Sequence, residues 1–109
     1  MDYLAPFYIE ERIYDVLQLR IEEGGARPRR GLEVYRIQCN VEVQERRHQI
    51  YRAFIFYVHD SAFARGEFDP SNPDPLLRRV RQSVWEYLQG NRQPLARSRW
   101  AQPVVLELR

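Results

Sequence analysis

The clearest pattern along the chain is an alternation of apolar and polar side chains between residues 35 and 44. The alternating apolar set is Tyr35, Ile37, Cys39, Val41 and Val43. A period of two is typical of a strand with one face in the core. Residues 50–59 are rich in aromatic and β-branched side chains and predict a second strand. The polar stretch 45–48 between them lacks Asn-Gly or Asp-Gly, which favours a four-residue hairpin loop.

The register of this hairpin follows from placing its apolar side chains on one face. A loop centred between Arg46 and Arg47 sets Cys39 opposite Phe54 on the core side. The same register turns a second set to the outer face, namely Tyr51, Ala53, Ile55 and Tyr57. There it sets Tyr57 opposite Arg36, Ile55 opposite Gln38 and Tyr51 opposite Glu42.

Two further segments show a helical spacing of apolar side chains. From Pro6 to Glu23 they recur at i, i+4, i+7, i+8 and i+12, which predicts an amphipathic helix that Gly24-Gly25 ends. From Asp74 to Gly90, a second helix is predicted with Asp74 as its N-cap. The apolar stripe of this second helix is Leu76, Leu77, Val80, Val84, Tyr87 and Leu88. After Pro103, residues 104–108 predict a short final strand.

These elements predict one α+β domain over residues 1–109. A small antiparallel or mixed sheet, made of the long central hairpin and the short C-terminal strand, packs with two amphipathic helices in the order α-β-β-α-β. The pattern leaves open which hairpin strand the last strand joins. The topology sets the basic loop 26–31 beside the long loop 61–73 at one end of the sheet. At the other end it brings Arg92, Arg97 and Arg99 close to Arg46, Arg47 and His48.

The composition argues against a membrane-spanning, secreted or disulfide-bonded protein. A hydrophobic fraction of 44% and a mean hydropathy of −0.62 indicate a soluble globular domain. Apolar runs stay well short of the roughly 20 residues that span a membrane, and the first residues lack a secretory pattern. The single cysteine, Cys39, excludes an internal disulfide. We therefore expect a cytoplasmic protein without membrane contact.

The charged residues limit the chemistry. Seventeen basic against 15 acidic residues give a net charge of +2, which is too balanced to indicate a nucleic-acid-binding protein. Every basic residue is arginine, so no lysine is present to form a Schiff base or to bind phosphate in a phosphate-binding loop. The guanidinium groups suit carboxylates, phosphates and aromatic faces.

Candidate catalytic groups do not converge in the predicted fold. His59, Asp60 and Ser61 are adjacent, and alternate residues of a strand point to opposite faces, so the three cannot form a hydrolase triad. Cys39 faces the core, where burial raises the pKa of a thiol and makes it inert. One cysteine and two histidines are too few soft ligands for a metal site. We predict no enzymatic activity, no cofactor and no metal.

Two surfaces are predicted to bind partners. The outer face of the second strand is too apolar to be left in water, and sheet edges need protection. The predicted partner surface comprises Arg36, Tyr51, Ile55, Tyr57, Arg29, Arg30, Phe63 and Phe68. A candidate anion or nucleic-acid patch comprises Arg46, Arg47, His48, Arg92, Arg97, Arg99, Arg78, Arg81 and Trp85. Arg81 and Trp85 stand at i and i+4, which predicts a cation–π pair.

The preferred functional hypothesis is a non-enzymatic protein-interaction or assembly module that forms a homo-oligomer or joins a larger complex. The alternative is RNA or single-stranded DNA binding through arginine and aromatic side chains. A small enzyme that clamps a phosphorylated or carboxylated substrate would need Arg46, Arg97 and Arg99 to converge beside a general base, and the sequence offers no such base. The element order resembles that of small virion head–tail joining proteins, which implies a structural role in a ring-like assembly.

Overall fold

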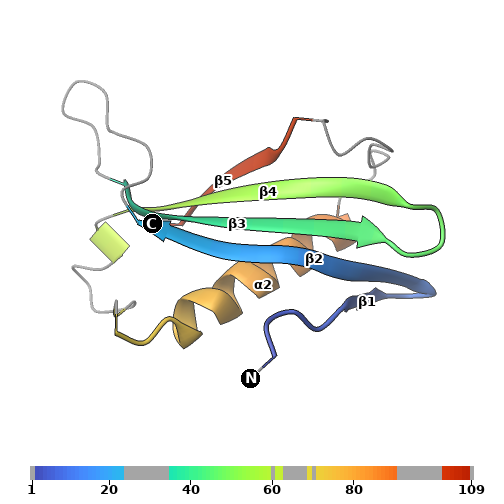
Figure 1. Ribbon diagram of the computed structural model, residues 1–109, viewed down its shortest axis with the longest axis horizontal. Coiled ribbons are helices and arrows are strands. Elements are labelled where there is room, and N and C mark those ends of the chain that lie inside the picture. The colour runs from blue at the N-terminus through green and yellow to red at the C-terminus, as the bar shows by residue number, and fades with distance from the viewer. Residues whose placement is uncertain are drawn as a thin grey trace.

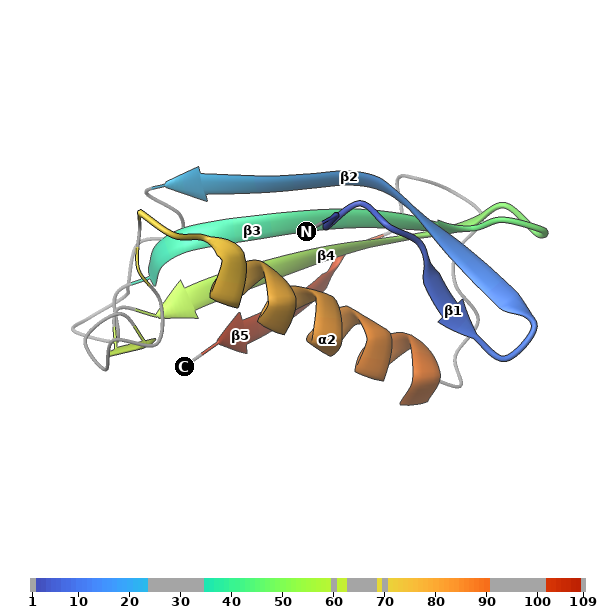
Figure 2. The ribbon, with the colours of Figure 1, turned by 90° about the horizontal axis from the view of Figure 1, so that it is seen from below.

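The computed structural model describes residues 2–23, 35–59, 61–62, 69, 71–90 and 102–108, with the side chains of Glu23, Tyr35 and Arg36 excepted. Its elements in chain order are β1 (Phe7–Ile9), β2 (Arg12–Glu23), β3 (Tyr35–Glu45), β4 (Ile50–His59), α2 (Asp74–Gly90) and β5 (Val104–Leu108). The five strands form one sheet in the order β1-β2-β3-β4-β5 (Figure 1). The first four are antiparallel neighbours and β5 runs parallel to β4. The sheet curls into a half-barrel, and α2 lies along its inner face (Figure 2).

The predicted α-β-β-α-β fold with two helices and a small sheet is wrong. Residues 6–23 form the hairpin β1–β2 instead of a helix. A register shift between Val16 and Gln18 marks a β-bulge, which moves the inward side chains from even to odd positions. The inward set is therefore Tyr14, Val16, Leu19 and Ile21. The apparent helical stripe instead combined the inward Val16 and Ile21 with Leu17, which is 43% exposed.

The turn between β1 and β2 also lacks a sequence signal. Ile9 pairs with Arg12, so only Glu10 and Glu11 form the loop, and Glu10 has a φ of 53°. Two-residue hairpin loops normally use glycine, asparagine or aspartate at a positive φ. The resemblance to head–tail joining proteins depended on the α-β-β-α-β order, and the observed order does not support it.

The central hairpin confirms the predicted faces but corrects the register. The loop is four residues long, as predicted, but it spans residues 46–49 because Glu45 still belongs to β3. Cys39 therefore pairs with Phe56, and Tyr57 lies opposite Gln38 instead of Arg36. A shift of two residues keeps the side chains from Ile37 to Val43 on their predicted faces, whereas a second irregularity between Tyr35 and Ile37 sets Tyr35 opposite His59.

The core lies between α2 and the inner face of β3 and β4. The buried apolar side chains of these two strands are Cys39, Val41, Val43, Phe54, Phe56 and Val58, and those of the helix are Leu76, Leu77, Val80, Val84 and Leu88. Tyr87 meets Phe54 edge-on, with ring centroids 5.2 Å apart. The helix confirms its predicted stripe, although its first hydrogen bond runs from the Leu77 N–H to the Pro73 carbonyl, one residue before the predicted cap. The final strand has its predicted bounds and joins β4.

We predict that Cys39 resists thiol reagents in the folded protein. The side chain is fully buried, and burial raises the pKa of the thiol to about 12, so almost no thiolate forms near neutral pH. Labelling by a disulfide reagent should be slow in native buffer and complete in denaturant. Rapid labelling of the native chain would contradict the position of Cys39 in the core.

Candidate interaction surfaces

The outer face of the sheet carries an apolar band along β4 and β5. Tyr51, Ile55 and Tyr57 are half-buried there, on the side opposite to the buried Phe54 and Phe56, as predicted. Val105 of β5 pairs with Ile55 and is 53% exposed. Helix α2 lies against the other face of the sheet (Figure 2), so among the described elements no helix covers this band.

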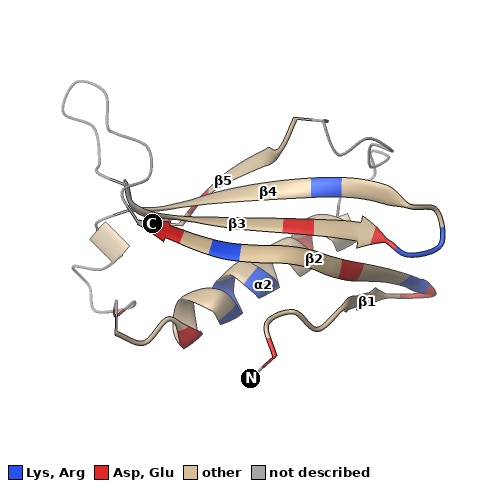
Figure 3. Cartoon of the chain, in the orientation of Figure 1, with Lys and Arg blue, Asp and Glu red and all other residues tan. Residues whose placement is uncertain are grey.

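Towards β2, the same face becomes polar. The Gln38 amide Nε2 donates a hydrogen bond to Asn40 Oδ1 at 2.8 Å. A hollow of about 370 Å³ opens where Ala53 is small, and its lining includes Gln18, Arg20, Asn40, Glu42, Ala53 and Ile55. Acidic and basic residues are mixed across the strands rather than gathered by sign (Figure 3). This mixture fits a protein partner better than a polyanion.

In the described part of the chain, most of the far side of β2 has no neighbouring strand. Strand β1 pairs only with Arg12–Tyr14, and beyond that point the described residues provide no further strand beside β2 (Figure 1). Two large apolar side chains on this stretch, Leu17 and Ile21, are 43% and 38% exposed. The sequence prediction missed this edge because it assigned the segment to a helix.

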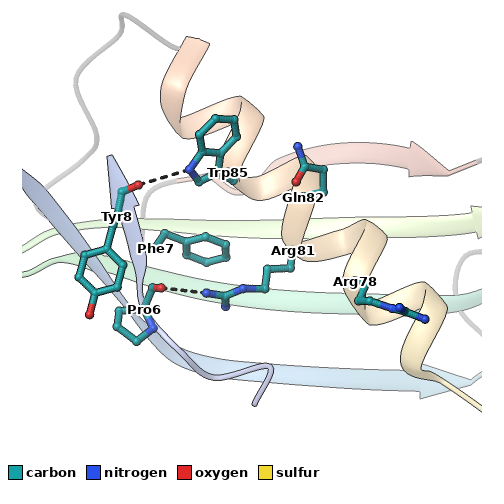
Figure 4. Close-up of a pocket in the computed structure, with 7 residues that line it drawn as sticks. All are labelled: Pro6, Phe7, Tyr8, Arg78, Arg81, Gln82 and Trp85. Carbon is teal, nitrogen blue, oxygen red and sulfur yellow. Dashed lines mark hydrogen bonds between the residues drawn. The ribbon is translucent and has the colours of Figure 1, made fainter. Parts of the chain in front are cut away.

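A groove of about 640 Å³ separates the N-terminal segment from one flank of α2 (Figure 4). Its lining residues are Pro6, Phe7, Tyr8, Arg78, Arg81, Gln82 and Trp85. The structure thus brings Arg78, Arg81 and Trp85 to one groove, as their helical spacing predicted. The Trp85 Nε1 donates to the Tyr8 carbonyl at 3.3 Å.

Arg81 ties the N-terminal segment to the helix. Its guanidinium donates to the carbonyls of Tyr3, Ala5 and Pro6, the last at 2.8 Å. The cation lies 4.2 Å from the centre of the Phe7 ring, so the predicted cation–π pair with Trp85 is replaced by one with Phe7. Burial lowers the pKa of Arg81 below its usual value, and the three carbonyls compensate the charge within the protein. Arg81 is therefore a structural clamp.

Arg46, in the turn between β3 and β4, also forms its contacts within the protein. Arg46 holds Asp15 of β2 through two hydrogen bonds, Nε to Oδ2 at 2.9 Å and Nη2 to Oδ1 at 2.6 Å. Its hydrogen bond to Asp15 lowers the pKa of that carboxyl. Arg47 and His48 are exposed at the tip of the turn. Of the predicted anion patch, this cluster therefore presents two side chains rather than three to a partner.

Glu45 is a buried carboxylate that the sequence prediction overlooked. It is 1% exposed and accepts hydrogen bonds from the backbone N–H of Arg47 at 3.3 Å and of His48 at 2.6 Å. The His48 Nδ1 lies 2.9 Å from the same carboxylate. Burial acts to raise the pKa of Glu45, but these hydrogen bonds outweigh it and the net shift is downward. The sequence analysis had placed Glu45 in the polar loop between the two hairpin strands, where it was expected to be exposed to solvent.

Several predicted site residues lie outside the described residues. They are Arg29, Arg30, Phe63, Phe68, Arg92, Arg97, Arg99 and the side chain of Arg36. The predicted meeting of loops 26–31 and 61–73 also stays a prediction. Helix α2 does return the chain to the hairpin end of the sheet (Figure 1), as the topology required.

Comparison with known proteins adds no relative. No protein-family model, curated protein or solved structure matches this chain. In the described part of the chain, every helix is too short or too polar to cross a membrane. Among the same residues, no three histidine, cysteine or acidic side chains gather in a way that could hold a metal ion.

We predict that Arg81→Gln lowers the free energy of unfolding by about 2 kcal/mol, because hydrogen bonds from a charged donor to three carbonyls are lost. Arg78→Gln is the matched control, since Arg78 is exposed on the same helix flank and its loss should cost less than about 0.5 kcal/mol. Denaturant unfolding of both variants measures the difference. Equal stability of the two would contradict the clamp.

We predict that Glu45 stabilises the fold in a pH-dependent way. Because its pKa is lower in the folded chain than the ordinary value of 4.5, this stabilisation is present above that pH and disappears as the pH falls through the folded value. Glu45→Ala should lower the unfolding free energy by about 2 kcal/mol at neutral pH. The gap between wild type and variant should narrow in acid. A gap independent of pH would contradict the assigned role.

Proposed function

We propose that the protein is a non-enzymatic assembly module that associates with protein partners, including its own copies, through the outer face of its sheet. The observation that carries this proposal is the apolar band of Tyr51, Ile55, Tyr57 and Val105, which lies on the face that α2 leaves uncovered. Aromatic and branched apolar side chains ringed by amides and mixed charges are the composition of a protein interface. A cytoplasmic location, inferred from the lone buried cysteine, belongs to the same proposal.

Single-stranded nucleic acid is the second candidate partner. The observation in its favour is the groove of Figure 4, whose lining combines two arginines with the rings of Tyr8 and Trp85 and includes no carboxylate. Stacking on exposed rings and contact with phosphates would suit such a surface. Against it, Arg81 is already held by three carbonyls, which leaves Arg78 as the groove's available cation.

We predict that light scattering gives a mass above 13.2 kDa that persists in high salt, because apolar contact is not screened by ions. Ile55→Glu should reduce this mass by placing a charge in the band. Leu4→Glu is the matched control, since Leu4 is 55% exposed but lies in the N-terminal segment. A chain whose association responds equally to both substitutions does not assemble through the outer face.

The same experiment separates the second candidate. Binding to a single-stranded oligonucleotide should weaken with salt on a log–log slope of about −0.7 for each phosphate contacted. Oligonucleotide binding that Trp85→Ala and Arg78→Gln abolish, in a chain that remains a monomer, would replace the assembly proposal with nucleic-acid binding.

A further inference from the structure

In the described part of the chain, the edge of β2 beyond Tyr14 has no strand beside it. Strand edges attract other strands, and proteins normally block them with proline, charged side chains, a bulge or a covering segment. Here the bulge lies between Val16 and Gln18, near the covered end of the strand. Beyond it, residues 18–23 pair with β3 in an unbroken ladder and contain no proline. Their charges are of both signs, with Arg20 against Glu22 and Glu23, so they can attract a complementary strand. Ile21, at the middle of Leu19–Glu23, is 38% exposed.

The hydrogen-bonding phase of β2 identifies the backbone groups that point outward. The Ile13 carbonyl accepts a bond from the Arg46 N–H at 2.8 Å, so Ile13 faces β3. Alternate residues of an antiparallel strand bond to the same neighbour, and the bulge adds one residue to this count. Gln18, Arg20 and Glu22 therefore bond to β3, whereas Leu19 and Ile21 direct their N–H and carbonyl groups to the open edge.

Charge selects the partner for this edge. Arg20 and Glu22 lie on the outer face on either side of Ile21, with Arg20 Nη2 3.7 Å from Glu22 Oε1 and both side chains about half exposed. The order along the strand is Arg20, Ile21, Glu22. When a second copy of the strand runs antiparallel to the first, each cation therefore faces an anion. A second copy in antiparallel register about Ile21 therefore sets Arg20 opposite the copy's Glu22, twice.

Other two-fold registers are less favourable. Pairing about Arg20 or about Glu22 sets like charges directly opposite each other, which destabilises a sheet. Pairing about Leu19 brings the bulges of both copies into the new ladder and interrupts its hydrogen bonds. Pairing about Ile21 avoids both penalties, and β1 lies at the other end of β2, beside Arg12–Tyr14, where it does not obstruct.

We propose that the β2 edge is a homodimerisation site, in which residues 19–23 of two copies pair antiparallel about a two-fold axis at Ile21. The two five-stranded sheets then form one continuous sheet with both helices on the same side. This contact uses the strand edge and does not depend on association through the outer face. Both outer faces remain free in the dimer.

A charge-swap series on the full chain tests this site. Light scattering of the wild-type chain should give at least twice 13.2 kDa at high micromolar concentration. Arg20→Glu and Glu22→Arg should each raise the dimer dissociation constant about tenfold, because each sets two pairs of like charges opposite one another. The double variant R20E/E22R restores both ion pairs and should return the constant to within about twofold of wild type. Arg78→Glu, which changes charge on the helix, is the matched control.

Amide hydrogen exchange supplies a second measurement. The N–H groups of Leu19 and Ile21 should exchange slowly only at concentrations at which the dimer forms. A dimer that R20E/E22R fails to restore, or whose formation leaves these two amides unprotected, overturns the site. Dimerisation abolished by Ile55→Glu but unaffected by Arg20→Glu would assign the contact to the outer face instead. A monomer at every concentration overturns this inference and self-assembly through the outer face together.

Discussion

A five-stranded sheet with one described helix can bury only one of its faces. This constraint determines which side chains of each strand are apolar and which are polar. The inner face packs Phe54 and Phe56 of β4 against the apolar stripe of α2. Everything that the helix cannot reach must be polar, or must find cover elsewhere. On β3 the outer side chains are amides and Glu42, whereas on β4 they are tyrosines, an alanine and an isoleucine. The difference between these two neighbouring strands is the basis of the assembly proposal.

Part of this arrangement could be predicted from the sequence. Strand β3 from Ile37, strand β4 up to Val58, strand β5 and helix α2 keep their periods, so their faces and most of their bounds follow from the spacing of apolar residues. The β1–β2 hairpin could not be predicted in this way, because the bulge at Val16 breaks its period and Glu10 turns the chain without a glycine. The apolar band on β4 was therefore foreseen, whereas the β2 edge was not. Spacing brought Arg78, Arg81 and Trp85 together, but it could not show that Arg81 serves the N-terminal carbonyls.

The arginines illustrate why residue type alone is a weak guide to a binding site. Arg46 and Arg81 belong to the predicted anion patch, yet one holds Asp15 and the other holds three backbone carbonyls and the Phe7 ring. A forked guanidinium is well suited to such internal ties. Arg46 is exposed, as Arg47 and Arg78 are, so only its hydrogen bonds to Asp15 distinguish it from them.

The parallel pairing of β5 with β4 constrains the order in which the chain reaches its native state. Antiparallel neighbours such as β3 and β4 close a short loop and can meet early, whereas β5 must wait until α2 has crossed the sheet. During synthesis the edge of β4 that carries Phe54 and Phe56 stays unpaired until Val104–Leu108 has been made. Pairing with β5 then covers a strand edge of the kind at which partly folded chains aggregate.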